Sequence, residues 1–149
     1  HLAGSLEQPT LITPHAGELS RLLNKRGVTV SAESIEADPR TWVEKASNIL
    51  GVTVLLKGSI TYVAQDSYVI ELPRATTYLA TAGSGDVLAG IISALVATNY
   101  IEILNSPTRL ADVAATGAFI HALAADQGGP ISASSIITAI PAVMAKLAP

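Results

Sequence analysis

The sequence predicts an α/β fold of three layers, in which helices cover both faces of a sheet. Three observations favour this fold: strands and helices alternate in the first half, the strand over 52–56 is apolar almost throughout, and helices fill the C-terminal part. A nearly continuous apolar strand is typical of a sheet that is buried on both faces, as parallel sheets are. We therefore expect a mostly parallel sheet, an added β-hairpin and a C-terminal helical cluster.

The first half of the chain has the pattern of short strands and helices separated by turn residues. Pro14 ends a β-prone run and suits the first turn of a helix, while Gly51 is a good C-terminal stop. Ser31 and Asp38 are candidate helix caps within a polar stretch that we otherwise expect to be a loop with a partial turn. The expected elements are a strand over 10–13, a helix over 14–23, a loop over 28–40, a helix over 41–50 and a strand over 52–56.

The second half predicts a hairpin followed by helices. Residues 65–67 are turn-prone and lie between two β-prone runs, which suits a hairpin. His121 lies on the apolar face of a long predicted helix, and we interpret it as a core histidine. The expected elements are strands over 60–64 and 68–72 and helices over 87–98, 108–127 and 132–147.

The composition is that of one domain, which we place over residues 1–149. Apolar residues make up 49% of the chain and aromatic residues 4%, so Ala, Val, Ile and Leu must build the core. Nine scattered Lys and Arg and a net charge of -3 argue against nucleic acid as a partner. The sequence has no cysteine and no apolar run of the roughly 18 residues that a membrane span needs. We expect a cytoplasmic protein and, because the chain starts at His1 rather than Met, a processed or truncated one.

The most informative stretch is a turn over 81–88, in which Gly83 and Gly85 precede an apolar helix. Glycines let the backbone approach a ligand closely, and the first N–H groups of a helix attract anions, so the turn suits a phosphate. Leu88 stands where a dinucleotide fingerprint needs its third glycine, and no Gly-Lys-Ser/Thr loop occurs. Asp86 fits a base that accepts the proton of an attacking hydroxyl. The alternative is a plain glycine-rich loop with Asp86 as a first-turn acid.

Two further segments follow predicted strands, at the ends where α/β folds bind ligands. Lys57 and Gly58 follow the apolar strand and could contact a nucleotide phosphate, or Lys57 could only solubilise the strand end. His15 opens a helix, with Glu18 three residues later, and could hydrogen-bond a ligand. The alternative for His15 is a local helix cap.

Three motifs occur in one order: Leu-Ile-Thr-Pro-His-Ala-Gly-Glu over 11–18, Val-Leu-Leu-Lys-Gly-Ser-Ile-Thr over 54–61, and Ala-Thr-Ala-Gly-Ser-Gly-Asp-Val-Leu-Ala-Gly over 80–90. Together they resemble the NAD(P)H-hydrate dehydratase family of the ribokinase-like superfamily, across almost the whole chain. The resemblance implies a ribokinase-like three-layer α/β/α fold, of which this chain would be the C-terminal part. It also implies that ATP or ADP, with Mg²⁺, phosphorylates the C6 hydroxyl of hydrated NADH or NADPH, and that loss of phosphate restores the reduced cofactor.

The resemblance also implies roles for single residues of the three motifs. His15 would contact the hydrated nicotinamide nucleotide, and Asp86 would be the base at its hydroxyl. Gly83 and Gly85 would bind the phosphates of the adenine nucleotide, and no residue is assigned as a metal ligand. The adenine nucleotide would also be lined by Lys57, Gly58, Ser59, Ile60 and Thr61.

The chain departs from the family pattern in two ways. Ala82 stands where the family has a glycine, and the family's N-terminal half, which carries part of the substrate pocket, is missing. We expect a homo-oligomer or association with the missing half, because unpaired sheet edges and apolar patches attract other chains. Two other functions stay open: a ribokinase-like kinase for a carbohydrate or vitamin precursor, and a noncatalytic nucleotide-binding fragment. His15 in its Thr-Pro-His-x-Gly-Glu motif favours the dehydratase.

Overall fold

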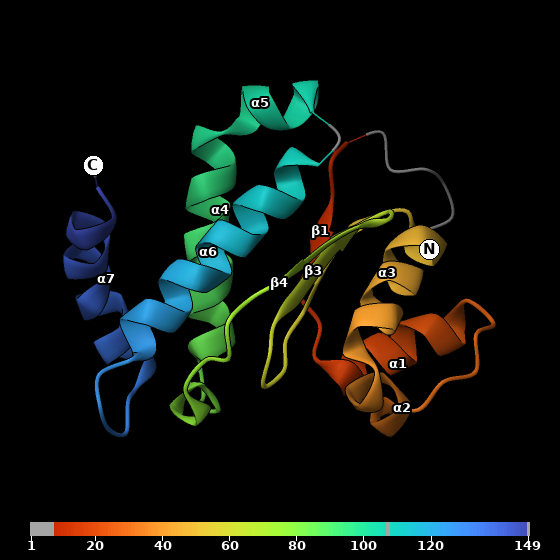
Figure 1. Ribbon diagram of the computed structural model, residues 1–149, viewed down its shortest axis with the longest axis horizontal. Helices are drawn as coiled ribbons and strands as arrows, with labels where there is room; N and C mark the ends of the chain where they lie inside the picture. The colour runs from red at the N-terminus through yellow and green to blue at the C-terminus, as the bar shows by residue number, and fades with distance from the viewer. Residues whose placement is uncertain (1–7, 107, 149) are drawn as a thin grey trace.

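The computed structural model describes residues 8–106 and 108–148, which form a four-stranded sheet between two groups of helices (Figure 1). One face of the sheet is covered by α1 (Ala16–Lys25), α2 (Ala32–Ala37) and α3 (Pro39–Leu50). The other face is covered by α4 (Ser84–Thr98) and α6 (Arg109–Ala125), with α7 (Ala133–Leu147) outermost. The remaining elements are β1 (Leu11–Ile12), β2 (Thr53–Leu56), β3 (Tyr62–Gln65), β4 (Tyr68–Glu71), the 3₁₀ helix η1 (Thr77–Leu79) and α5 (Tyr100–Asn105).

The strands lie in the order β1-β2-β3-β4. β1 pairs with β2 in parallel, while β2 with β3 and β3 with β4 are antiparallel pairs. The three-layer arrangement is as expected, but the expectation of a mostly parallel sheet is wrong for this part of the chain. The short connection over 57–61 explains the difference. Parallel neighbours need a crossover of a dozen or more residues, so β3 can return beside β2 only in the antiparallel direction.

Alternate residues of the central strands point to opposite helical layers, as successive side chains of a strand do. Val54 and Leu56 of β2 pack with the α1–α3 layer, whereas Leu55 packs with α4 and α6. Val63 of β3 joins Leu55 on that second face. All four residues of β2 are buried, which confirms that this strand is covered on both faces.

Side-chain caps begin two helices of the first layer. Ser31 Oγ accepts a hydrogen bond from the Ser34 N–H at the start of α2, and Asp38 Oδ1 accepts one from the Thr41 N–H in α3. Both candidate caps are therefore confirmed. The stretch that we expected to be a loop nevertheless contains the six-residue helix α2, whose one buried side chain is Ile35.

The start of the first helix and two short elements also differ from the sequence-based expectation. The first helix begins at Ala16 rather than at Pro14, because His15 has extended backbone angles and acts as the N-cap. The short helix α5 and the 3₁₀ turn η1 were not indicated by any sequence pattern. Neither is long enough to show a hydrophobic period.

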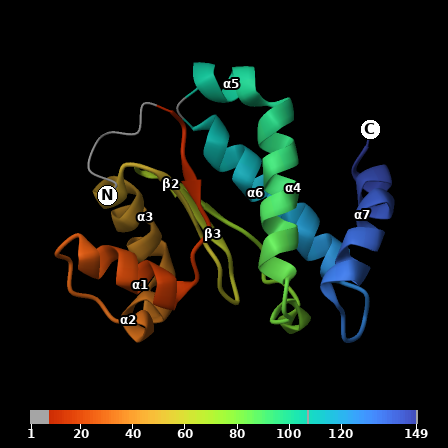
Figure 2. The ribbon, with the colours of Figure 1, turned by 180° about the vertical axis from the view of Figure 1, so that it is seen from behind.

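The C-terminal helices form the expected cluster, in which α4 lies between the sheet and α7 when seen from behind (Figure 2). α4 and α6 approach closely where Gly117 of α6 faces Ile92 of α4. In the described part of the chain, no helix is long and apolar enough to cross a membrane. The chain's one tryptophan, Trp42, lies in the opposite layer on α3, with Lys45 Nζ 4.9 Å from the centre of its ring.

Candidate functional site

Two of the sequence motifs meet because β1 and β2 run in parallel. The pairing continues beyond the strands, where His15 and Lys57 form an isolated parallel bridge and the Lys57 N–H donates to Pro14 O at 2.8 Å. The carboxyl ends of parallel strands share one edge of a sheet. The His15 and Lys57 motifs are thus side by side, although 42 positions separate them in the sequence.

His15 is the N-cap of α1, which confirms the local helix cap that the sequence analysis gave as an alternative for this residue. Its Nδ1 accepts hydrogen bonds from the N–H groups of Gly17 and Glu18, and Glu18 Oε2 accepts one of 2.8 Å from the His15 N–H. This reciprocal arrangement is a capping box. The cap does not bury the ring: the His15 side chain is 55% exposed, which leaves it accessible to a ligand.

Glu18 also connects this cap to Lys57. The Lys57 Nζ lies 3.8 Å from Glu18 Oε2. The pKa of Glu18 is lowered, first by its hydrogen bond from the His15 backbone and then by the charges of Lys57 and His15. A carboxylate at this place keeps Lys57 extended across the strand ends, toward the glycine-rich turn. A Cβ placed on Gly85 would lie 3.7 Å from Lys57 Nζ.

The glycine-rich turn presents free backbone donors to the same region. Gly83 is the N-cap of α4, with a φ of 80° that favours glycine, and no side chain caps the helix. The N–H groups of Gly83 and Gly85 have no acceptor among the described residues. Unpaired N–H groups and the helix dipole make such a turn an anion site. Asp86 is exposed on the first turn of α4, and its carboxylate makes no hydrogen bond or ion pair within residues 8–106 and 108–148.

A cavity of about 620 Å³, which we term the inner cavity, lies between the Lys57 turn and the start of α4. Of the residues that we predicted to bind the nucleotide, Gly85, Lys57, Gly58, Ser59 and Thr61 line it. Gly83 and Asp86 do not line it. The rest of its wall is His15, residues of the segment over 74–81 that contains η1, and residues of α4 and α6. These are Arg74, Ala75, Thr76, Thr77, Leu79, Ala80, Thr81, Ser84, Leu88 and His121.

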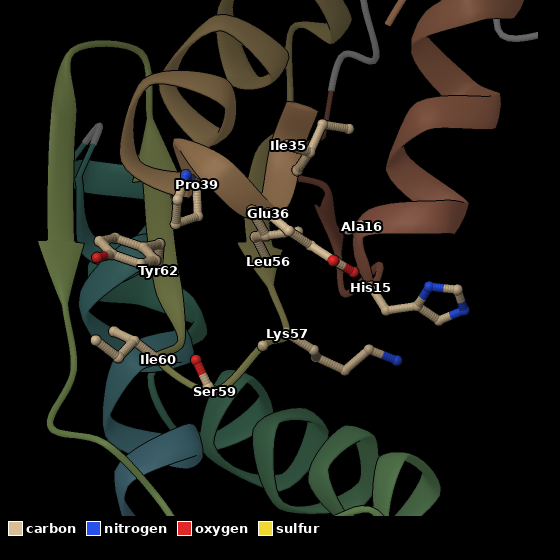
Figure 3. A pocket seen from close by; sticks show the side chains of 11 residues that line it. His15, Ala16, Ile35, Glu36, Pro39, Leu56, Lys57, Ser59, Ile60 and Tyr62 are labelled. Atoms are coloured by element: carbon tan, nitrogen blue, oxygen red, sulfur yellow. The ribbon is translucent and has the colours of Figure 1, made fainter. Parts of the chain in front are cut away.

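A second cavity of about 700 Å³, the outer cavity, lies on the other side of the Lys57 turn, against α2 and α3 (Figure 3). Ser59 points into it, while Lys57 and His15 extend to the same side of it. The predicted nucleotide residue Ile60 lines this cavity rather than the inner one. Ile60 is the last residue of the bend over 58–60, whereas the next residue, Thr61, lines the inner cavity.

His121 is the residue whose part in this site the sequence did not indicate. It is 5% exposed, as a core histidine should be, yet it lines the inner cavity from α6. Its Nε2 lies 3.2 Å from the Oγ of Ser84, the first residue of α4. Burial lowers the pKa of His121, with a hydrogen bond to the Ser84 backbone acting in the other direction. The ring is therefore neutral near pH 7.

Comparisons with known proteins agree with the motifs. A family model described as NAD(P)H-hydrate dehydratase matches residues 3–140. The ADP-dependent (S)-NAD(P)H-hydrate dehydratase of Neisseria meningitidis serogroup B is 40% identical over 117 residues, which cover 78% of this chain and 35% of that protein. The chain thus spans about a third of the length of this curated relative.

Solved structures show the same fold. A ribokinase-like superfamily protein from Enterococcus faecalis is 26% identical, with a TM-score of 0.75 over 97% of this chain and 48% of that one. An ADP/ATP-dependent NAD(P)H-hydrate dehydratase from Bacillus subtilis, co-crystallized with ATP/Mg²⁺, is 21% identical, with a TM-score of 0.78 over 94% of this chain and 48% of that one. The ribokinase-like fold is therefore confirmed, for a chain that covers about half of each structure.

Proposed function

Since this chain belongs to the NAD(P)H-hydrate dehydratase family, we propose that it supplies the nucleotide-binding part of an enzyme that dehydrates hydrated NADH or NADPH with ATP or ADP. One observation carries the proposal. The free N–H group of Gly85 and the ammonium of Lys57 come together at a cavity large enough for a nucleotide, and the free N–H group of Gly83 lies two residues before Gly85. Backbone donors, a helix dipole and a cation are the groups that bind phosphates.

We place the adenine nucleotide in the inner cavity, with its terminal phosphate at the glycine-rich turn. Lys57 Nζ reaches that phosphate from the strand side, while Gly58, Ser59 and Thr61 line the path of the rest of the nucleotide. Ile60 belongs to the same segment, but it lines the outer cavity. The loop over 74–81 forms the opposite wall of the same cavity.

The phosphoryl transfer requires a hydroxyl, a base and an in-line phosphate. We assign Asp86 as the base, because it follows Gly85 directly on an exposed first helical turn and its carboxylate has no partner in the described part of the chain. The C6 hydroxyl oxygen of the hydrated nicotinamide bonds to the terminal phosphorus, its proton passes to Asp86, and the bond from that phosphorus to the leaving nucleotide breaks. The phosphate then leaves from C6 as the neighbouring ring carbon gives up a proton, which restores the double bond.

His15 is suited to the substrate rather than to the phosphate donor. Its Nδ1 is engaged by the backbone of α1, whereas its Nε2, which lies 3.6 Å from Glu18 Oε1, is the ring nitrogen that can meet a ligand. His15 borders both cavities at the edge of the sheet where Lys57 also ends. We assign it to the hydrated nicotinamide nucleotide, with Glu18 fixing its backbone.

Magnesium fits this site as an ion that accompanies the nucleotide. In the described ranges no three His, Cys, Asp or Glu side chains are grouped to hold a metal. Mg²⁺ prefers phosphate oxygens, water and one or two carboxylates over an all-protein cage. When bound, it would neutralise charge on the transferring phosphate.

We further propose that the chain works in association, either with the remaining half of the fold or with copies of itself. β1 is an edge strand of the described sheet, and an apolar groove lies beside it. Leu11, Ile92, Val96 and Leu110 are among the residues that line this groove. The cytoplasmic location expected from the sequence stays a prediction.

Thermal protection by Mg²⁺-ADP tests the anion site. About 100 Kd of nucleotide should add about 2.7 kcal/mol to the free energy of unfolding. Gly85→Val should abolish this protection, because its side chain would fill the space under Lys57 Nζ. Gly90→Val is the matched control: it changes the same helix in the same way, where nothing lies within 4 Å of an added Cβ. Equal protection of the two variants would refute the proposed phosphate position.

Product analysis separates the dehydratase from the alternative kinase. With hydrated NADH and ATP, the protein that carries this chain should regenerate NADH, which is followed by its absorbance, and release inorganic phosphate. A kinase for a small alcohol would instead leave a stable phosphate ester and form no NADH. A noncatalytic module would be protected by nucleotide and would give neither product.

A further inference from the structure

The buried pair of His121 and Ser84 ties the glycine-rich turn to a helix that follows much later in the chain. Ser84 is 4% exposed and is the first residue of α4, while His121 belongs to α6. Their side chains meet at 3.2 Å, at one end of an interface in which α4 and α6 pack mainly through apolar side chains. At the other end, Arg109 Nη2 of α6 donates to Oδ1 of Asn99, the C-cap of α4, at 2.9 Å. A polar link at one end of an apolar interface fixes the relative position of the atoms that it joins.

The contact between Ser84 and His121 restrains the two glycines whose N–H groups form the anion site. Ser84 lies between Gly83 and Gly85, whose N–H groups have no acceptor in the described residues. No side chain caps α4, so the Ser84–His121 contact is the one side-chain hydrogen bond that restrains its first turn among residues 8–106 and 108–148. Glycines on both sides of Ser84 allow more backbone conformations than other residues do. Backbone hydrogen bonds from Ser84 to Thr81 and from Asp86 and Val87 to Gly83 also hold the turn.

We propose that His121 is a positioning residue for the phosphate site: by holding Ser84, it keeps the Gly85 N–H and the Asp86 carboxylate in the directions that phosphate binding and proton acceptance require. The inference rests on the proposed function for its catalytic meaning. Whatever the reaction at this site, the buried side chain of His121 in α6 would hold the first turn of α4 in place. His121 itself does not take part in proton transfer.

Three single variants test the pair. His121→Leu removes the ring nitrogens at similar volume, His121→Gln keeps a donor and acceptor near the position of Nε2, and Ser84→Ala removes the partner. The affinity for Mg²⁺-ADP should fall about tenfold in His121→Leu and in Ser84→Ala, which is the loss expected from one buried hydrogen bond. His121→Gln should stay within about threefold of the parent, since that bond can reform.

The exchange of backbone amide hydrogens over residues 83–87, measured without nucleotide, is the second readout. Exchange should speed up in His121→Leu and in Ser84→Ala and return toward the parent rate in His121→Gln. If the parent binds no adenine nucleotide, the proposed function fails while the exchange data still decide the inference. Unchanged exchange and affinity in a folded His121→Leu, with only a lower Tm, would overturn the positioning role. If His121→Leu does not fold, Ser84→Ala decides by the same two measurements.

Steady-state kinetics of the protein that carries this chain show whether His121 affects nucleotide binding, turnover or both. A positioning role predicts that His121→Leu raises KM for the nucleotide and also lowers kcat, because Gly85 and Asp86 move together. A purely structural role predicts that both constants of the folded enzyme stay at the parent values. That outcome would again overturn the inference.

Discussion

Replacing Gly117 by alanine should destabilise the fold through one close contact between α4 and α6. A Cβ at position 117 would lie 2.6 Å from Ile92 Cγ1 and 3.4 Å from Ile92 Cα. Carbon atoms pack at about 3.5–4.0 Å, so the helices must separate or Ile92 must leave its rotamer. Ile92 is 3% exposed and has little room to move. Such overpacking costs about 1–3 kcal/mol.

Gly90→Ala provides the matched control for this estimate. Position 90 lies inside α4, and nothing is within 4 Å of an added Cβ there. Both substitutions gain the roughly 1 kcal/mol by which alanine exceeds glycine in a helix interior. Gly90→Ala should therefore stabilise the protein, and the difference in unfolding free energy between the two variants should equal the overpacking cost of about 1–3 kcal/mol.

Urea unfolding followed by circular dichroism measures this difference, provided that the m-value is unchanged. The truncation Ile92→Ala should cost less in the Gly117→Ala background than in the parent, because it removes the clashing atoms. Equal unfolding free energies for Gly117→Ala and Gly90→Ala would refute the reasoning. So would additive effects of the Gly117 and Ile92 substitutions.

Three further predictions concern the base, pH and association. Asp86→Asn should lower kcat by roughly 10²–10⁴, as loss of a general base does, and should preserve thermal protection by ADP; unchanged turnover would remove Asp86 from the mechanism. Burial lowers the pKa of His121, so the unfolded chain binds more protons than the folded one below about pH 6.5. Stability should thus be constant above that pH and fall below it, more steeply in the parent than in His121→Gln, as thermal melts between pH 8 and pH 5.5 would show. Light scattering should give a particle larger than the 15.3 kDa chain, and a cooperatively unfolding monomer would contradict the association.

Local sequence signals predicted the parts of the structure that depend on local chemistry. Ser31 and Asp38 cap helices as expected, because a cap needs only a side-chain oxygen next to free N–H groups. The buried strand β2 was evident from its run of apolar residues. Helix α2 was missed, since a six-residue helix with Ile35 as its one buried residue has no measurable period.

The site was predictable to the extent that its motifs follow strands. Parallel pairing brings His15 and Lys57 together, as two strand ends at one sheet edge should be. The position of Ile60 on the outer cavity depends on how the bend over 58–60 turns the chain, which the motif alone does not fix. The contact between His121 and Ser84 depends on how α6 packs across α4, 37 positions away in the sequence. The helical periodicity of α6 places His121 among the buried residues, and it does not show which residue of another helix the ring contacts.

The position of Trp42 makes the tryptophan fluorescence of this chain specific to one of its two helical layers. The indole, with Lys45 beside it, belongs to α3 on the sheet face opposite α4 and α6. Because the chain has no other tryptophan, its intrinsic emission reports the layer of α1–α3 and not the glycine-rich turn. A ligand in the inner cavity should leave this emission nearly unchanged. A tryptophan introduced at the partly exposed Phe119 of α6 would give the opposite layer a signal of its own. Unfolding of the two layers could then be timed separately in one molecule.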